Sequence, residues 1–157
     1  MKCTVKEFLD LSREIFVQGG VLRFCAHGGS MRPFIKDGDI LKIASVTADK
    51  IALGDVILYH KDEESIIVHR VVKKILEENK PSFLVKGDMN PPYGEIVSVQ
   101  NILGKVVGIE RNKRKFNFDR GIGRLQNKIY ARISLFFSRR IYPFLVKIKR
   151  IFSRVKD

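Results

Sequence analysis

Between residues 21 and 111 the chain carries short runs of Val, Ile, Leu and Phe, separated by Gly, Pro, Asp and Asn. Such runs predict β-strands, and the residues between them predict turns. Short strands at this spacing favour a mainly β fold, built as a curved and mostly antiparallel sheet, over alternating β-α units. The expected strands are residues 21–26, 40–46, 55–60, 65–75, 82–86 and 103–110.

Apolar residues at helical spacing flank this region on both sides. At the start of the chain, Thr4 and Glu7 have the spacing of a capping box, which predicts an amphipathic helix over residues 4–17. Beyond residue 119 a second apolar period, broken at Pro143, predicts two basic amphipathic helices or one kinked helix. The predicted organisation is an N-terminal helix (1–19), a β domain (20–111) and a basic helical tail (112–157).

The charge of the chain is unevenly distributed. It has 30 Lys and Arg against 17 Asp and Glu, a formal net charge of +13. Up to residue 104 there are 14 basic and 14 acidic residues, hence no net charge, whereas the remainder has 16 basic and 3 acidic residues, hence +13. The sequence therefore describes a neutral body and a basic tail, and the two need separate explanations.

Composition excludes several classes of protein. A hydrophobic content of 45% argues against a disordered body. The two cysteines, Cys3 and Cys25, form no CxxC pair, and Cys25 lies in an apolar run where a buried free thiol is expected. No zinc-type spacing or glycine-rich phosphate loop occurs, so we expect no metal and no cofactor. Without a membrane-length apolar run or a secretory signal, the cytoplasmic side is favoured.

Three polar residues follow or interrupt the predicted strands. Ser30 comes after two glycines that allow a tight turn, His69 lies inside a β-branched run that would partly bury it, and Asp88 follows a glycine at a strand end. Each has an ordinary structural explanation, as a turn or as a core histidine. Together they supply a nucleophile, a base and an acceptor that could orient the base, in the order Ser, His, Asp.

The segments around these residues resemble the conserved boxes of type I signal peptidases and their relatives, over roughly residues 20–110. The matching boxes, in family order, are Gly29-Ser30-Met31-Arg32-Pro33 with Gly38-Asp39, then Gly54-Asp55-Val56-Ile57, Val68-His69-Arg70-Val71-Val72, Lys86-Gly87-Asp88-Met89-Asn90 and Gly104-Lys105-Val106-Val107. The resemblance implies the curved β fold of that family and a serine endopeptidase that cleaves a precursor protein.

The box around the candidate base, residues 68–72 (here called the base box), sets the subtype that the resemblance implies. Its residue is His69, as in archaeal and endoplasmic-reticulum relatives, where typical bacterial members have lysine. Ser30 would then attack the peptide carbonyl, with His69 as general base and Asp88 as the acid. The backbone N–H of Ser30 is the implied oxyanion donor, and Gly28 stands where many lysine-type members have a second donor hydroxyl. Histidine-type relatives carry a second aspartate, for which Glu95 is the candidate here.

Three other residues are weaker candidates for the base. His27 is so near Ser30 in sequence that an extended chain would point it elsewhere. His60 is expected in an exposed hairpin loop. Lys86 could serve a lysine-type mechanism, but it lies in the box around Asp88 (residues 86–90, here called the acid box) and not in the base box.

The tail has a composition typical of helices that lie on membranes. In residues 120–157 basic side chains alternate with Phe, Ile, Leu and Tyr, which favours peripheral binding to an anionic membrane surface. Nucleic-acid binding would not need the apolar side chains and is not expected as the role of the tail, while a helical hairpin docked on the body is the remaining alternative.

Two alternative hypotheses compete with the hypothesis of a peptidase that acts on a peptide or protein substrate. One is an autoproteolytic regulator of the SOS-repressor type, which would use a lysine base and a separate DNA-binding domain. The predicted N-terminal helix is too short for a helix-turn-helix, which argues against that hypothesis. The other is a non-catalytic relative that is anchored by its basic tail.

Overall fold

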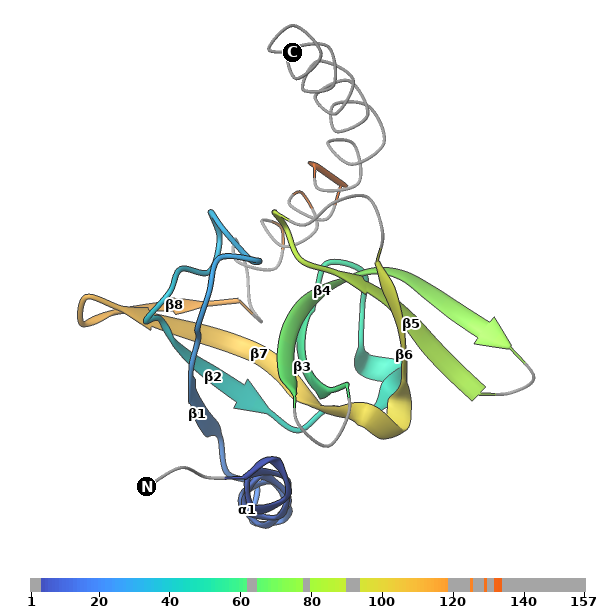
Figure 1. Ribbon diagram of the computed structural model, residues 1–157, viewed down its shortest axis with the longest axis horizontal. Helices are drawn as coiled ribbons and strands as arrows, with labels where there is room; N and C mark the ends of the chain where they lie inside the picture. The colour runs from blue at the N-terminus through green and yellow to red at the C-terminus, as the bar shows by residue number, and fades with distance from the viewer. Residues whose placement is uncertain are drawn as a thin grey trace, which may run out of the picture.

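The computed structural model describes residues 4–61, 65–77, 80–89 and 94–118, with positions 125, 129, 132 and 133 of the tail. These residues form a curled antiparallel sheet with one helix against it (Figure 1). The strand order is β1-β2-β7-β3-β4-β5-β6, and β8 also pairs with β7. The strands are β1 (Leu22–Cys25), β2 (Ile40–Ala44), β3 (Val56–His60), β4 (Ile66–Glu77), β5 (Lys80–Lys86), β6 (Glu95–Ser98), β7 (Ile102–Arg111) and β8 (Arg114–Asn117).

The predicted mainly β, antiparallel fold is confirmed, and all six predicted strands are present. Two further strands were not predicted. β6 has only four residues, and every side chain of β8 is exposed, so neither carries a strong hydrophobic pattern. β8 returns along β7 through a two-residue turn, in which Asn112 and Lys113 both have positive φ, as a tight hairpin requires. Two short 3-10 turns, Ala48–Lys50 and Val99–Asn101, complete the described elements.

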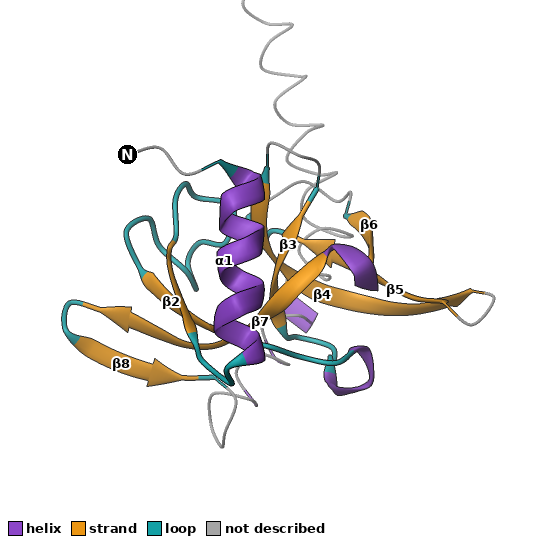
Figure 2. Ribbon diagram, turned by 90° about the horizontal axis from the view of Figure 1, so that it is seen from below, coloured by secondary structure: helices purple, strands orange, loops and turns teal. Residues whose placement is uncertain are grey.

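The predicted N-terminal helix is α1 (Val5–Val17), and its capping box is present. The Thr4 hydroxyl accepts from the Glu7 backbone N–H at 3.3 Å, while the Glu7 carboxylate accepts from the Thr4 N–H at 2.8 Å. Figure 2 shows the helix lying across one face of the sheet. Phe8 of the helix meets Phe24 of β1 edge to face, with ring centroids 5.7 Å apart. Helix α1 therefore covers the apolar side of the sheet near β1.

Strand β3 separates two hydrophobic cores because its successive side chains point to opposite faces. The first core contains Leu22, Ala26, Met31, Ile35, Leu41, Ile43, Val56, Leu58, Val106, Ile109 and Phe118. The second contains Ile51, Ile57, Tyr59, Val71, Phe83, Val85 and Val97. Both faces of β3 are covered, so the strand is buried from Val56 to Tyr59. This leaves the phenol of Tyr59 inside a core, where its hydroxyl needs a partner.

The expectation of a buried Cys25 is wrong, since the side chain is exposed. In β1 the side chains alternate, so that Leu22 and Phe24 turn toward the core while Arg23 and Cys25 turn to solvent. His60, expected in an exposed loop, is instead the half-buried last residue of β3.

The tail helices predicted beyond residue 119, and the break at Pro143, lie outside the described residues. Within the described part of the chain, no helix combines the length and apolar composition that crossing a bilayer requires.

Candidate active site

Ser30 lies in the loop that joins β1 to β2, residues 26–39, which we call the nucleophile loop after the predicted role of Ser30. Hydrogen bonds fix this loop at its base, and a buried side chain fixes it in its middle. Gly38 donates a backbone hydrogen bond to the Ala26 carbonyl, and Ala26 donates one to the Asp39 carbonyl, both at 2.8 Å. Met31, directly after the serine, is buried in the first core. Ser30 itself is half-buried, so its position is set by the loop on both sides.

Glycine is required at one of the two positions before the serine. Gly28 has φ +86°, a conformation that side chains with a Cβ rarely adopt, and its N–H donates to the Asp37 carboxylate at 2.8 Å. Gly29 has no positive φ, and a Cβ there would meet only the Arg32 side chain, at an ordinary 3.7 Å. The predicted tight turn therefore depends on Gly28.

His69 lies in β4, and only 12% of its side chain is exposed, as its β-branched surroundings predicted. Its register partner on β3 is Ile57, which makes Tyr59 its diagonal neighbour on the same face. The Tyr59 hydroxyl lies 3.0 Å from Nδ1 of the imidazole. The ring is therefore held by a phenol that the sequence did not single out.

Glu95 reaches this histidine from the first position of β6. The Tyr59 hydroxyl donates a hydrogen bond to Oε1 of Glu95, and the same oxygen lies 3.9 Å from Nδ1 of His69. Lys61, just beyond β3, forms an ion pair with Oε2 at 3.2 Å. The carboxylate thus belongs to a cluster of Tyr59, Lys61, His69 and Glu95, which we call the imidazole cluster.

The imidazole cluster favours a neutral base. Burial lowers the pKa of His69 below its ordinary value, and the carboxylates of Glu95 and Asp88 offset this only in part. Burial and the Glu95 carboxylate raise the pKa of the Tyr59 phenol, which therefore keeps its proton. Burial also raises the pKa of Glu95, but the hydrogen bonds from Tyr59 and Lys61 outweigh it, and the pKa lies below its usual range.

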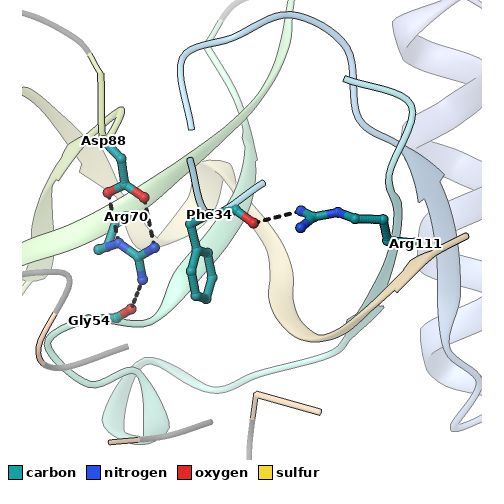
Figure 3. A network of polar contacts seen from close by, with 5 residues as sticks. All are labelled: Phe34, Gly54, Arg70, Asp88 and Arg111. Atoms are coloured by element: carbon teal, nitrogen blue, oxygen red, sulfur yellow. Dashed lines mark hydrogen bonds and ion pairs between the residues drawn. The ribbon is translucent and has the colours of Figure 1, made fainter. Parts of the chain in front are cut away.

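Asp88 is engaged elsewhere. Its two carboxylate oxygens accept from Nε and Nη2 of Arg70, each at 2.8 Å, and the Arg70 side chain is fully buried (Figure 3). Nη1 of Arg70 donates to the Gly54 carbonyl at 2.9 Å, and the guanidinium lies 4.5 Å from the centre of the Phe34 ring. Arg111 donates to the Phe34 carbonyl at 2.9 Å. We call Gly54, Phe34, Arg70 and Asp88 the arginine cluster.

Two links connect the three predicted boxes. The Met89 N–H donates to the Ser30 carbonyl at 2.8 Å, which ties the acid box to the nucleophile loop. The ion pair of Arg70 with Asp88 ties the acid box to β4 beside His69. The fold therefore gathers residues that are far apart in the sequence into one region.

Two cavities adjoin this region and share Ile67 as a wall. The first, about 300 Å³, is lined by Ser30 and mainly by apolar side chains, among them Phe24, Ile35, Ile66 and Val68. The second, about 240 Å³, is lined by His69, Glu95, Lys61 and Lys86, among others. Ser30 and His69 thus face neighbouring cavities.

Among the described residues, no hydrogen bond joins the Ser30 hydroxyl to the His69 ring, and none joins Asp88 to His69. The catalytic roles of Ser30, His69 and Asp88 stay predictions. Lys86 is buried, and burial lowers its pKa, with Asp88 opposing the shift. The described residues contain no group of three or more His, Cys, Asp or Glu side chains that could hold a metal ion.

Sequence reasoning missed Tyr59 and Arg70. Both lie in predicted strands, and Arg70 lies within the base box, but their partners depend on how β3, β4 and β5 are paired. Glu95 pairs with Val85 of β5, and Val85 pairs with Val71 of β4, so Glu95 reaches His69 across a whole strand. The available sequence signal was Tyr59 near the end of an apolar strand, because a buried phenol hydroxyl needs a hydrogen-bond partner.

Comparison with known proteins finds relatives of one kind. A signal peptidase complex catalytic subunit SEC11 from Metarhizium robertsii is 33% identical over 90 residues, covering 51% of this chain and 52% of the relative. The SEC11 subunit of Candida tropicalis is 40% identical over 63 residues, covering 40% and 37%. Human SEC11C is 38% identical over 64 residues, covering 40% and 33%. The chain thus spans about half or less of the curated relatives it matches. No family model matches it.

Proposed function

Because this chain is a signal-peptidase-like protein, similar in sequence to signal peptidase catalytic subunits, we propose that it is a serine endopeptidase that cleaves a peptide bond in a precursor protein. In this proposal Ser30 is the nucleophile and His69 is the general base. The backbone N–H of Ser30 is the oxyanion donor.

The proposed reaction follows the chemistry of a serine and a histidine. Nε2 of His69 takes the proton from the Ser30 hydroxyl as Oγ attacks the peptide carbonyl. The protonated imidazole then gives that proton to the leaving amine, which leaves an ester between Ser30 and the amino-terminal fragment. A water molecule, deprotonated by the same histidine, hydrolyses the ester and restores the serine.

The observation that carries the proposal is the mostly buried His69, held at Nδ1 by Tyr59, in the region to which the nucleophile loop is tied. A base must be unprotonated to accept the serine proton, and burial favours that state. The bond from Met89 to the Ser30 carbonyl holds the nucleophile loop against the acid box, and Arg70 holds the acid box against β4. Catalytic hydrogen bonds are often long or poorly aligned before substrate binds, so we expect Ser30 and His69 to approach when a peptide occupies the site.

The cavity beside Ser30 supports a substrate with apolar side chains near the cleaved bond. Its lining includes Phe24, Met31, Ile35 and Val68, which offer little to a charged group. We therefore expect peptides with small or apolar residues at this position to be cleaved faster than peptides with acidic or basic ones.

The test is cleavage of a synthetic peptide library by the full chain, with products identified by mass spectrometry. We expect Ser30→Ala and His69→Ala each to lower kcat/KM at least about a thousandfold, because the two groups act as one unit. Ser45→Ala and His60→Gln are the matched controls, since both residues lie outside the site. Cleavage that survives Ser30→Ala at the wild-type rate would overturn the proposal.

We propose in addition that residues 120–157 hold the protein on an anionic membrane surface. The support is their charge, since residues 120–157 have 11 Lys and Arg against one Asp, a net charge of +10, and each Lys or Arg near such a surface contributes about 1 kcal/mol. We expect salt-sensitive sedimentation of the full chain with phosphatidylserine vesicles, weakened by Lys147→Glu with Lys149→Glu. The same exchange at Lys50 and Lys73, on the body, is the control. Equal binding to uncharged vesicles would contradict this role.

A further inference from the structure

The imidazole of His69 is held on its Nδ1 side by a phenol, with a carboxylate behind it. We propose that Tyr59 is a positioning residue that accepts the Nδ1 proton of His69 and donates its own proton to Glu95, so that Glu95, and not Asp88, is the acid that supports the base. The inference rests on the proposed function for the role of His69, but the hydrogen bonds that it describes can be measured without any substrate.

The distances favour a relay through the phenol over direct contact. Tyr59 Oη lies 3.0 Å from Nδ1, within hydrogen-bond range, whereas Glu95 Oε1 lies 3.9 Å from the same nitrogen, beyond it. The same carboxylate oxygen accepts from the Tyr59 hydroxyl. Glu95 therefore reaches the imidazole through Tyr59.

Counting protons fixes the form of the histidine. A phenol has one proton, and an ionised carboxylate can only accept, so the Tyr59 proton lies toward Glu95. The remaining lone pairs of Oη can only accept, so Nδ1 of His69 must carry a hydrogen. The neutral ring then leaves Nε2 unprotonated, which is the nitrogen that the proposed reaction needs.

The charges around the ring maintain this arrangement. Tyr59 is 1% exposed, and burial together with Glu95 raises the pKa of its phenol, so the donor is not lost at ordinary pH. The charged groups that face His69 are Glu95 from β6, Asp88 after β5, Lys61 after β3, and Lys86 of β5, which lines the same cavity. Lys61 pairs with Glu95 and helps to keep that carboxylate ionised.

The other predicted acid is already committed. Both oxygens of Asp88 accept from the buried Arg70 guanidinium, in the planar two-bond geometry that this pair prefers. Among the described residues no hydrogen bond joins either oxygen of Asp88 to the His69 ring, whereas both oxygens bond the fully buried Arg70 side chain. The arrangement thus assigns Asp88 to holding the fold and Glu95 to supporting the base.

Nitrogen NMR of the histidine rings tests this directly. The chain has three histidines, so His27→Gln and His60→Gln assign the spectrum of the labelled protein. We expect His69 in the wild type to carry its hydrogen on Nδ1 alone, and Tyr59→Phe to convert it to a mixture or to the Nε2–H form. A wild-type ring with its hydrogen on Nε2, or an unchanged ring in Tyr59→Phe, would overturn the proposal.

A second variant separates the charge from the hydrogen bond and keeps the test decisive if Tyr59→Phe does not fold. Glu95→Gln retains an oxygen that accepts from Tyr59 but removes the negative charge that raises the pKa of His69. We expect the ring to keep its Nδ1 hydrogen while its pKa falls. A pKa that rises or stays the same in Glu95→Gln would contradict the relay.

Kinetics provide a readout that a merely structural role would not move. With a cleaved peptide in hand, Tyr59→Phe should lower kcat about ten- to a hundredfold, the range expected for one hydrogen bond to a group that becomes charged, with little change in KM. An unchanged kcat would count against the relay. If no peptide is cleaved by the wild type, the proposed function fails, while the NMR result still decides the relay.

Discussion

His69 and Arg70 are neighbours on β4, yet they belong to two different polar clusters. Successive side chains of a strand point to opposite faces, so His69 enters the imidazole cluster and Arg70 enters the arginine cluster. In the arginine cluster a guanidinium pairs with a carboxylate, and 0% of the Arg70 side chain and 5% of the Asp88 side chain are exposed. In the imidazole cluster burial keeps the histidine neutral although two carboxylates lie nearby.

The two clusters differ in how their charged groups are paired and in their access to a cavity. The arginine cluster joins β4, the acid box and the nucleophile loop, and its charged groups are satisfied by each other. In the imidazole cluster the Tyr59 hydroxyl connects His69 to Glu95, and both of these residues line a cavity. A buried ion pair such as Arg70–Asp88 can hold strands and loops in place. A neutral imidazole beside a cavity, such as His69, is suited to proton transfer.

The largest expected effect comes from breaking the arginine cluster. Asp88→Asn leaves the Arg70 charge buried without its carboxylate, which we expect to lower the free energy of unfolding by about 3–5 kcal/mol. Urea denaturation followed by circular dichroism measures this. The control is Asp10→Asn, which removes the partner of Arg13 in an exposed pair and should cost less than about 1 kcal/mol. If Asp88→Asn lowers the free energy of unfolding no more than the control does, the ion pair does not stabilise the fold.

A smaller effect is expected in the loop that carries Ser30. Gly28→Ala forces a Cβ into a left-handed conformation, which should cost about 1–2 kcal/mol and displace Ser30 enough to lower kcat. Gly29→Ala, one residue on, meets only ordinary contact and should change the stability by less than about 0.5 kcal/mol. Thermal unfolding and peptide cleavage of both variants check this, and equal effects would contradict the turn described for Gly28.

The smallest effect concerns the charge balance of the imidazole cluster. Activity should rise with pH as His69 loses its proton, with a midpoint below the ordinary histidine value of about 6.5, because burial lowers the pKa of His69. Lys61→Met removes a cation that also lowers this pKa, so the midpoint should move to higher pH, less so at high salt because Lys61 is largely exposed. A shift to lower pH would contradict the sign of this balance.

The sequence predicted the helix and the strands better than it predicted the contacts within the candidate site. Short runs of Val, Ile, Leu and Phe predicted six strands, and the spacing of Thr4 and Glu7 predicted the helix cap, since both depend on local sequence. Ser30, His69 and Asp88 were found through motifs. Glu95 was predicted only as the candidate for a second acid, and Tyr59 was not found at all. Their contacts with His69 depend on the register of β3 with β4 and on a strand, β6, too short to recognise.

The most direct test of the account is covalent labelling of the nucleophile. A fluorophosphonate reacts with a serine whose hydroxyl is activated by a neighbouring base, and mass spectrometry locates the adduct. We predict a single adduct on Ser30 of the full chain, lost in His69→Ala and retained in His60→Gln. An unlabelled Ser30 in the folded wild type, or labelling that persists unchanged in His69→Ala, would contradict the claim that Ser30 and His69 form a catalytic pair.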